Sequence, residues 1–217
     1  MDRLTRQIGT FATDLTFDNL GKDIANLGAQ HLIDTLGCAI GAHDCQAAEI
    51  GRRLASNQSP GVFPGRILFK NSVLPLEMAG FINACMIRNF DFNDRYPGGH
   101  PSDGLGAHLA LAGAMPINGK RFLAAVLVTY EVFIRLSEFS KMSHLGWDQG
   151  FAVGLSAAAG VCTIDGVPTN DNRADMCRAR LIEVTPDKEV VFDMWIDGSN
   201  EVPPMPLSSF RAEHVPI

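Results

Sequence analysis

The sequence predicts a mainly α-helical domain that is followed by a short β-hairpin. Apolar residues recur at helical spacing through most of the chain before residue 163. Residues 180–197 instead hold two β-branched and aromatic runs on either side of a TPDK turn signal. We therefore expect a helical bundle over residues 1–162, and a separate tail over residues 163–217 that carries the hairpin.

Six segments have the apolar spacing or small-residue content of packed helices. Pro75 is suited to begin one of them, and Asn118 is suited to cap the most apolar one. A short strand is expected at residues 66–69. The expected helices span residues 18–42, 46–55, 75–88, 104–114, 120–140 and 149–162. The first should bury a stripe made of Leu20, Ile24, Leu27, His31, Leu32, Leu36 and Ile40.

Composition and charge exclude several classes of function. Of the 217 residues, 46% are hydrophobic and 19% are charged, which is too apolar for a disordered chain. The net charge of −6 gives no basic surface for nucleic acid. No apolar run is long enough to span a bilayer, and the N-terminal residues do not resemble a signal peptide. We expect a cytoplasmic protein with no nucleic-acid or membrane partner.

The loop at residues 89–104, NFDFNDRYPGGHPSDG, concentrates titratable side chains between two expected helices. Asp91, Asp94 and His100 are of metal-ligand type, but no second His or Glu stands at a helical spacing to complete a set. A histidine near two carboxylates is also suited to move protons near neutral pH. Arg95 and the amides that begin the next helix are suited to hold an anionic substrate.

A third interpretation of the loop involves no function. In it the loop is a solvated turn, Asp91 and Asp94 cap a helix, and His100 is incidental. Spacing alone leaves the acid–base site and the plain turn both open. We expect no metal and no other cofactor.

The segment DFNDRYPGGHPSDGLGAHLALAGA closely resembles the loop of the 2-methylcitrate dehydratase (MmgE/PrpD) family, whose signature is D-[FY]-[DN]-D-x followed by GHPSD. Three flanking segments are similar to the same family and occur in its order. They are LIDTLGCAIGA at residues 32–42, AAVLVTYEVFIRL at 124–136 and GWDQGFAVGLSAAAG at 146–160. The resemblance covers about residues 7–162.

The resemblance implies a metal-free lyase that acts by acid–base elimination on a tricarboxylic or dicarboxylic acid, with a helical domain, a separate lid and a homodimeric assembly. Members of the family dehydrate 2-methylcitrate, decarboxylate cis-aconitate or epimerise related dicarboxylates. Carried over by position, the catalytic residues are Asp91 and His100. The substrate-binding candidates are Asp94, Arg95, Ser102 and Gln149. Arg95 stands where a threonine is common, and Gln149 where several members have a histidine.

The resemblance ends near residue 162. Family members are longer than this chain, and residues 163–217 do not resemble their lid, so we expect a truncated member. The hairpin segment is weakly similar to a strand pair of the arylsulfotransferase kind, which is too little to imply that activity. Three functions stay open: a lyase, a catalytically silent remnant or fusion product that retains the helical core and dimer surface, and a subunit that a second chain completes.

Overall fold

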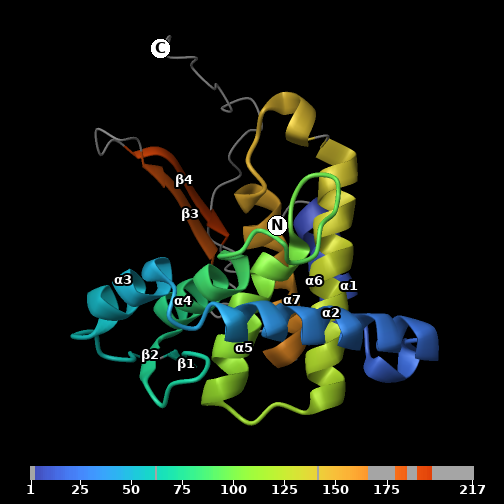
Figure 1. Cartoon of the computed structure of the whole chain (residues 1–217). Coiled ribbons are helices and arrows are strands. Elements are labelled where there is room, and N and C mark those ends of the chain that lie inside the picture. Colours follow the sequence, from blue (N-terminus) through green and yellow to red (C-terminus); the bar gives the residue numbers. More distant parts are fainter. Residues whose placement is uncertain (1–2, 62, 141, 166–178, 185–189, 197–217) are drawn as a thin grey trace.

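A computed structural model describes residues 3–61, 63–140, 142–165, 179–184 and 190–196. The fold is mainly α-helical, as predicted, with two antiparallel pairs of strands in the described part (Figure 1). The helices are α1 (Arg3–Asp14), α2 (Lys22–Gly41), α3 (Gln46–Ala55), α4 (Leu76–Arg88), α5 (Leu105–Ala114), α6 (Gly119–Ser140) and α7 (Gly150–Asp165). The strands are β1 (Pro64–Arg66), β2 (Val73–Pro75), β3 (Ala179–Val184) and β4 (Val190–Ile196).

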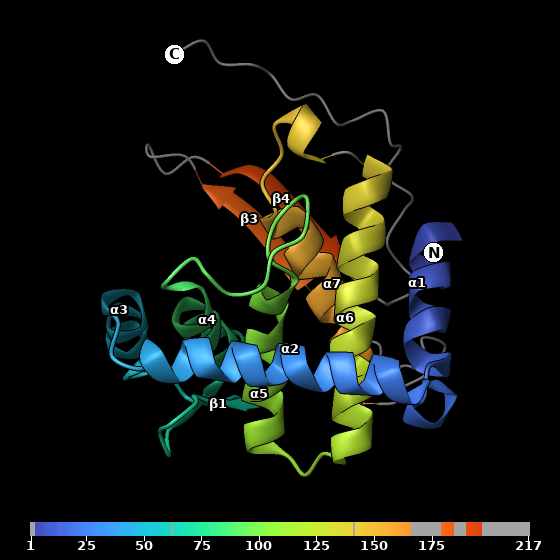
Figure 2. The same cartoon turned by 45° about the vertical axis from the view of Figure 1, so that its right-hand side comes forward.

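The long helix α6 is the centre of the bundle. It contacts α1, α2, α5 and α7, and Figure 2 shows α7 alongside it while α2 crosses it. Its buried side chains, among them Phe122, Val126 and Phe133, point in several directions around the helix. A helix that is apolar around most of its circumference must be covered on most sides. At its N-terminus the Asn118 side chain accepts a hydrogen bond from the Lys120 amide at 2.8 Å, which confirms the expected cap.

The buried face of α2 differs from the expected stripe. Ile24, Leu27 and Ile40 are each about half exposed, whereas small residues such as Gly28 and Cys38 face inward. A Cβ atom at Gly28 would lie 3.0 Å from the Leu127 side chain of α6. The close crossing of these two helices therefore selects the small-residue side of α2, and the large apolar residues are left at the surface.

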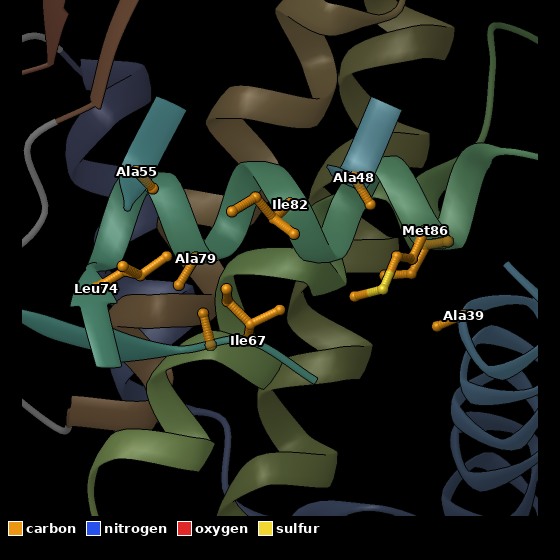
Figure 3. Close-up of a cluster of buried hydrophobic side chains, with 10 residues drawn as sticks. Ala39, Ala48, Ala55, Ile67, Leu74, Ala79, Ile82 and Met86 are labelled. Atoms are coloured by element: carbon orange, nitrogen blue, oxygen red, sulfur yellow. The ribbon is translucent and has the colours of Figure 1, made fainter. Parts of the chain in front are cut away.

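A cluster of alanines and larger apolar side chains joins α3, α4 and the β1–β2 pair (Figure 3). In this cluster Ile82 and Met86 of α4 are fully buried. Asn83 is also fully buried; its Oδ1 accepts a hydrogen bond from the Leu68 amide at 2.9 Å, and its Nδ2 donates to the Gly106 carbonyl at 3.3 Å. The buried side-chain amide of Asn83 thus links α4 to α5 and to the segment after β1. Strand β1 itself lies at residues 64–66, slightly earlier than the expected residues 66–69.

The N-terminal helix α1 was not expected from the sequence. Ala12 is fully buried, and its carbonyl oxygen accepts a hydrogen bond from the Thr163 hydroxyl of α7 at 2.7 Å. Helix α1 therefore covers part of α6 and α7, and Figure 2 shows it beside α6.

Strands β3 and β4 form the predicted hairpin, with Ala179 opposite Ile196 and an irregularity between Glu183 and Val184. The predicted turn at residues 185–188 lies outside the described residues. Helix α7 continues to Asp165, and the division of the chain at residue 162 stays a prediction. Among the described helices, none is both long enough and apolar enough to cross a membrane.

Candidate functional site

The loop between α4 and α5 is folded back on itself by a tight turn. The backbone amides and carbonyls of Tyr96 and Gly99 exchange two hydrogen bonds, both 2.9 Å long. Gly98 and Gly99 have φ angles of 112° and 145°, a region that L side chains rarely adopt. The local sequence YPGG therefore dictates the turn, and the loop then enters α5 through a short 3-10 turn, Pro101–Gly104.

His100 is held in one tautomer by the loop's own backbone. Its Nδ1 lies 2.6 Å from the Asp94 carbonyl oxygen, and its side chain is only 12% exposed. A carbonyl oxygen only accepts, so Nδ1 must carry the proton that is donated. In the neutral ring Nε2 is then the basic nitrogen, and it lies 3.6 Å from Oδ1 of Asp91.

Asp91 is held in place by Arg88, at the end of α4. The Arg88 guanidinium donates a hydrogen bond to Asp91, and this bond and the positive charge lower the pKa of the Asp91 carboxyl. Asp91 has a φ angle of 59°, a left-handed conformation that Asp tolerates better than most residues. Sequence reasoning missed Arg88, although its position three residues before Asp91 was a signal of this pair.

Gln149, just before α7, fastens the loop to the bundle. Its Oε1 accepts a hydrogen bond from the His100 amide at 2.6 Å, and its Nε2 lies 3.4 Å from Oδ2 of Asp103. A Cβ atom at Gly99 would lie 2.0 Å from the same Oε1. Gln149 therefore occupies space that only a glycine at position 99 leaves free.

A buried polar cluster lies beneath His100. The Asn93 side chain donates to Ser102 Oγ at 2.8 Å and to Asp103 Oδ1 at 3.0 Å, while the Ser102 hydroxyl donates to Asp94. Burial raises the pKa of Asp103 to about 6, against the opposing effects of the Asn93 hydrogen bond and the Arg88 charge. The Nε atom of Arg88 lies 3.5 Å from Oδ2 of Asp103.

A second buried histidine supports the start of α5 from behind. His108 is fully buried; its Nδ1 lies 3.0 Å from the Gly104 carbonyl oxygen and its Nε2 lies 2.9 Å from the Thr129 hydroxyl. Burial lowers the pKa of His108 to about 4, so the ring is neutral near pH 7. A Cβ atom at Gly160 would lie 2.0 Å from His108 Nε2, so α7 approaches this ring closely.

A pocket of about 510 Å³ lies on the other side of the loop, between α2 and α6. Asp94 and Arg95 line it, but His100 and Asp91 do not. The loop therefore separates the predicted site residues: Asp91, His100 and Gln149 lie together on one side and Asp94 and Arg95 on the other. Ser102 is fully buried between them. The other lining residues are His31, Asp34, Phe92, Asn93, Tyr96, Pro101, Tyr130 and Ile134.

Sequence reasoning missed the contribution of α2 and α6 to this pocket. The rings of His31 and Tyr130 are 4.7 Å apart, so these two residues form a joint aromatic wall. The Tyr130 hydroxyl is buried and has no partner at good hydrogen-bonding geometry in the described residues, although Asp94 and Thr35 lie close to it. Burial, and then the nearby charge of Asp94, raises the pKa of Tyr130 well above its usual value.

The described residues contain no group of three or more His, Cys, Asp or Glu side chains that is arranged to hold a metal ion. They do provide a basic ring nitrogen on His100, a carboxylate beside it that Arg88 keeps ionised, and a guanidinium on Arg95 that forms no ion pair in the described part of the chain. This set can move a proton and can attract an anion.

Comparison with known proteins gives one matching family. Residues 6–173 match the family model described as MmgE/PrpD N-terminal domain. The chain is 30% identical over 152 residues to the 2-methylcitrate dehydratase of Escherichia coli K12, covering 63% of this chain and 31% of that protein. It is 30% identical over 156 residues to the enzyme of the same name from Cupriavidus necator, covering 64% and 32%. The chain thus spans about a third of the length of the curated relatives that it matches.

Proposed function

Since the chain belongs to the MmgE/PrpD family through its N-terminal domain, we propose that its loop between α4 and α5 carries the acid–base part of a metal-free lyase. The reaction is elimination of water from a tricarboxylic or dicarboxylic acid. The observation that carries the proposal is the fixed tautomer of His100. The Asp94 carbonyl holds the proton on Nδ1, and Nε2 is left as a base beside an ionised carboxylate.

Elimination of water needs a base for the proton next to a carboxylate and an acid for the departing hydroxyl. In our proposal the Nε2 atom of His100 takes that proton, and the imidazolium that results is stabilised by Asp91. The low pKa of Asp91 fits a role as an orienting anion rather than as the acid. The protonated Nε2 then returns the proton to the leaving hydroxyl.

The remaining candidates divide between holding the substrate and holding the loop. Arg95 is exposed and free of ion pairs in the described part of the chain, which supports a role in attracting a substrate carboxylate. Ser102 has no exposed surface, and both polar atoms of the Gln149 side chain are engaged by His100 and Asp103. We therefore propose that Ser102 and Gln149 act by positioning the loop. The backbone carbonyl of Asp94, which holds His100, has the same role.

A homodimer and a cytoplasmic location are further parts of the proposal. Large apolar side chains such as Ile33 and Ile40 of α2 and Phe92 of the loop are exposed. Exposed apolar surface of this kind favours association. The cytoplasmic location rests on the sequence.

A catalytically silent helical module is the alternative, and one observation favours it. The family position at which several members have a histidine holds Gln149, whose amide cannot transfer a proton near pH 7. Groups that act together in catalysis are not additive, and removing one commonly lowers the rate on the order of 10³-fold. We therefore expect weak binding of polycarboxylates and slow turnover by the chain alone.

The test is incubation of the full chain with 2-methylcitrate and citrate while the rise in ultraviolet absorbance of an unsaturated product is followed, and with cis-aconitate while the loss of that absorbance by the reverse addition of water is followed. His100→Ala should abolish any turnover and leave the helical circular-dichroism signal unchanged. The matched control is His43→Ala, because His43 is exposed and lies outside the loop. Rapid dehydration that His100→Ala does not affect would overturn the proposal, whereas binding without turnover would favour the silent module.

A further inference from the structure

Two cysteine thiols lie next to each other where the start of α3 packs against α4. Cys45 is the residue before α3, and Cys85 lies in the last turn of α4. Both thiols are free and partly buried, and both pack against the cluster of buried side chains that Figure 3 draws. The Sγ atom of Cys45 lies 3.9 Å from the backbone carbonyl oxygen of Cys85. The fold thus brings two thiols that are 40 positions apart in sequence into one local contact.

The backbone fixes both cysteines in place. The Cys45 amide donates to the Ala42 carbonyl at 3.0 Å, and the Cys45 carbonyl oxygen accepts from the Glu49 amide at 3.0 Å in the first turn of α3. Cys85 is part of α4, which contacts both α2 and α3. Rotation of the two side chains about χ1 is therefore the motion that remains for bringing the Sγ atoms to bonding distance.

The described free thiols differ in reactivity. Burial, and then the neighbouring Cys45 group, raises the pKa of the Cys85 thiol. The thiolate is the form that attacks an oxidant, so Cys85 is a poor first nucleophile near pH 7. Cys38 is only 4% exposed, and burial raises the pKa of its thiol as well. Cys45 is thus the described free thiol that is placed to react first, with Cys85 beside it as the second.

We propose that Cys45 and Cys85 are a redox pair that forms a reversible disulfide on contact with hydrogen peroxide, without rearrangement of α3 or α4. The Cys45 thiolate attacks one oxygen of the peroxide and the O–O bond breaks, which leaves a sulfenic acid on Cys45 and releases one water. The Cys85 sulfur then attacks the Cys45 sulfur. The S–S bond forms as the hydroxyl group of the sulfenic acid leaves with the Cys85 proton as a second water. Two thiols are oxidised and one peroxide is reduced to two waters.

The disulfide ties the last turn of α4 to the residue that precedes α3. A small-molecule thiol reverses it by thiol–disulfide exchange, so in a reducing compartment the bond is transient. The proposal does not depend on the lyase activity, because neither His100 nor Asp91 takes part in it.

The experiment is a peptide map of the full chain after treatment with hydrogen peroxide and alkylation of the remaining thiols. Cleavage after Lys and Arg and before Asp places Cys38, Cys45 and Cys85 in the separate peptides 34–43, 44–52 and 71–88. Mass spectrometry should find 44–52 joined to 71–88, dithiothreitol should separate them, and 34–43 should remain alkylated. The oxidised chain should also unfold at a higher urea concentration than the reduced chain, because closing a loop of about 40 residues lowers the entropy of the unfolded state.

Two alanine variants separate the pair from a thiol outside it. In Cys85→Ala the sulfenic acid on Cys45 has no thiol to resolve it, so labelling of peptide 44–52 by dimedone should rise about tenfold over the unmodified chain. The matched control is Cys38→Ala, which should leave both the cross-link and the dimedone labelling unchanged.

The proposal is overturned if peptides 44–52 and 71–88 stay separate after peroxide treatment, or if 34–43 is the peptide that becomes joined. It is also overturned if the Cys45–Cys85 bond lowers the urea concentration at which the chain unfolds, because the bond would then require rearrangement of the helices. None of these outcomes affects the test of dehydration on His100.

Discussion

The carboxylates on the two sides of the loop between α4 and α5 differ in whether they have a cationic partner. On the His100 side, Asp91 and Asp103 both contact Arg88, and Asp103 also accepts from Asn93 and lies near Gln149. On the pocket side, the described residues provide Asp34 and Asp94 with no ion pair. On the first side both carboxylates therefore have a cationic partner, and on the second side neither has one among the described residues.

This difference shows how one loop can be rigid and receptive at once. Satisfied hydrogen bonds fix the orientation of His100, which acid–base chemistry requires. The same bonds leave few free donors or acceptors on that side. On the pocket side Asp94 accepts hydrogen bonds from Ser102 but has no cationic partner among the described residues, and Asp34 and Arg95 are exposed.

The largest expected effect comes from breaking the attachment of the loop at Gly99. In Gly99→Ala the new Cβ atom would overlap Gln149 Oε1, and the residue would keep a φ angle that disfavours side chains. We expect the free energy of unfolding to fall by about 2 to 3 kcal/mol, from backbone strain and the lost hydrogen bond to the His100 amide. Chemical denaturation measures the change.

Gly37→Ala is the matched control for this substitution. Gly37 lies inside α2, and a Cβ atom there would meet no described atom within 4 Å. Because alanine favours helix more than glycine does, this variant should be more stable by up to about 1 kcal/mol. If Gly99→Ala unfolds no more easily than Gly37→Ala, the attachment through Gln149 does not hold the loop.

The second prediction concerns the pH dependence that Asp103 contributes. Burial raises its folded pKa to about 6 from the ordinary value of 3.8. The folded state therefore binds the proton more tightly, and the stabilisation present below the unfolded pKa is lost as pH rises through 6. The stability of the unmodified chain relative to Asp103→Asn should fall by about 3 kcal/mol between pH 4 and pH 7. A difference that does not change with pH would contradict the burial of this carboxyl.

The third prediction is an opposite pH dependence from His108, behind the loop. Burial lowers its folded pKa to about 4 from 6.5, so protonation favours the unfolded chain as pH falls from 6.5 to 4. In the unmodified chain Asp103 offsets this loss. In Asp103→Asn the contribution of His108 should appear as a loss on the order of 3 kcal/mol over that range. Urea unfolding at several pH values, with Asp103→Asn/His108→Gln as the control that lacks the slope, tests it.

The sequence predicted most helices because their signals are local. Helix α3 matches its expected range, and α4 and α6 begin within one residue of theirs, at positions where Pro75 and Asn118 mark the start. The loop residues Asp91 and His100 were also found locally, through the motif. The buried face of α2 was wrong because it depends on Gly28 meeting α6, which is a contact between distant segments.

The divided arrangement of the site had no local signal. His31 and Tyr130 are far apart in sequence, and only the crossing of α2 over α6 brings them together. Likewise Gln149 stands at a family position that suggested substrate binding, but its contacts with His100 and Asp103 depend on how closely Gly99 approaches it. Pairings of this kind follow from tertiary structure and not from spacing.

The smallest expected effect is the difference in the free energy of unfolding between Tyr96→Phe and Tyr130→Phe. These are the two tyrosines of the chain, and their hydroxyls differ in hydrogen bonding. The Tyr96 hydroxyl donates to Glu138 at 2.6 Å, whereas the Tyr130 hydroxyl is buried beside Asp94 and Thr35 without good hydrogen-bonding geometry to either. Removing a paired hydroxyl loses a hydrogen bond, so Tyr96→Phe should lower stability slightly. Removing an unpaired buried hydroxyl relieves a desolvation penalty, so Tyr130→Phe should leave the free energy of unfolding unchanged or raise it by up to about 1 kcal/mol. Denaturation of the two variants side by side measures the difference. If Tyr130→Phe is the more destabilised variant, the Tyr130 hydroxyl is hydrogen-bonded to Asp94 or Thr35 in the folded chain.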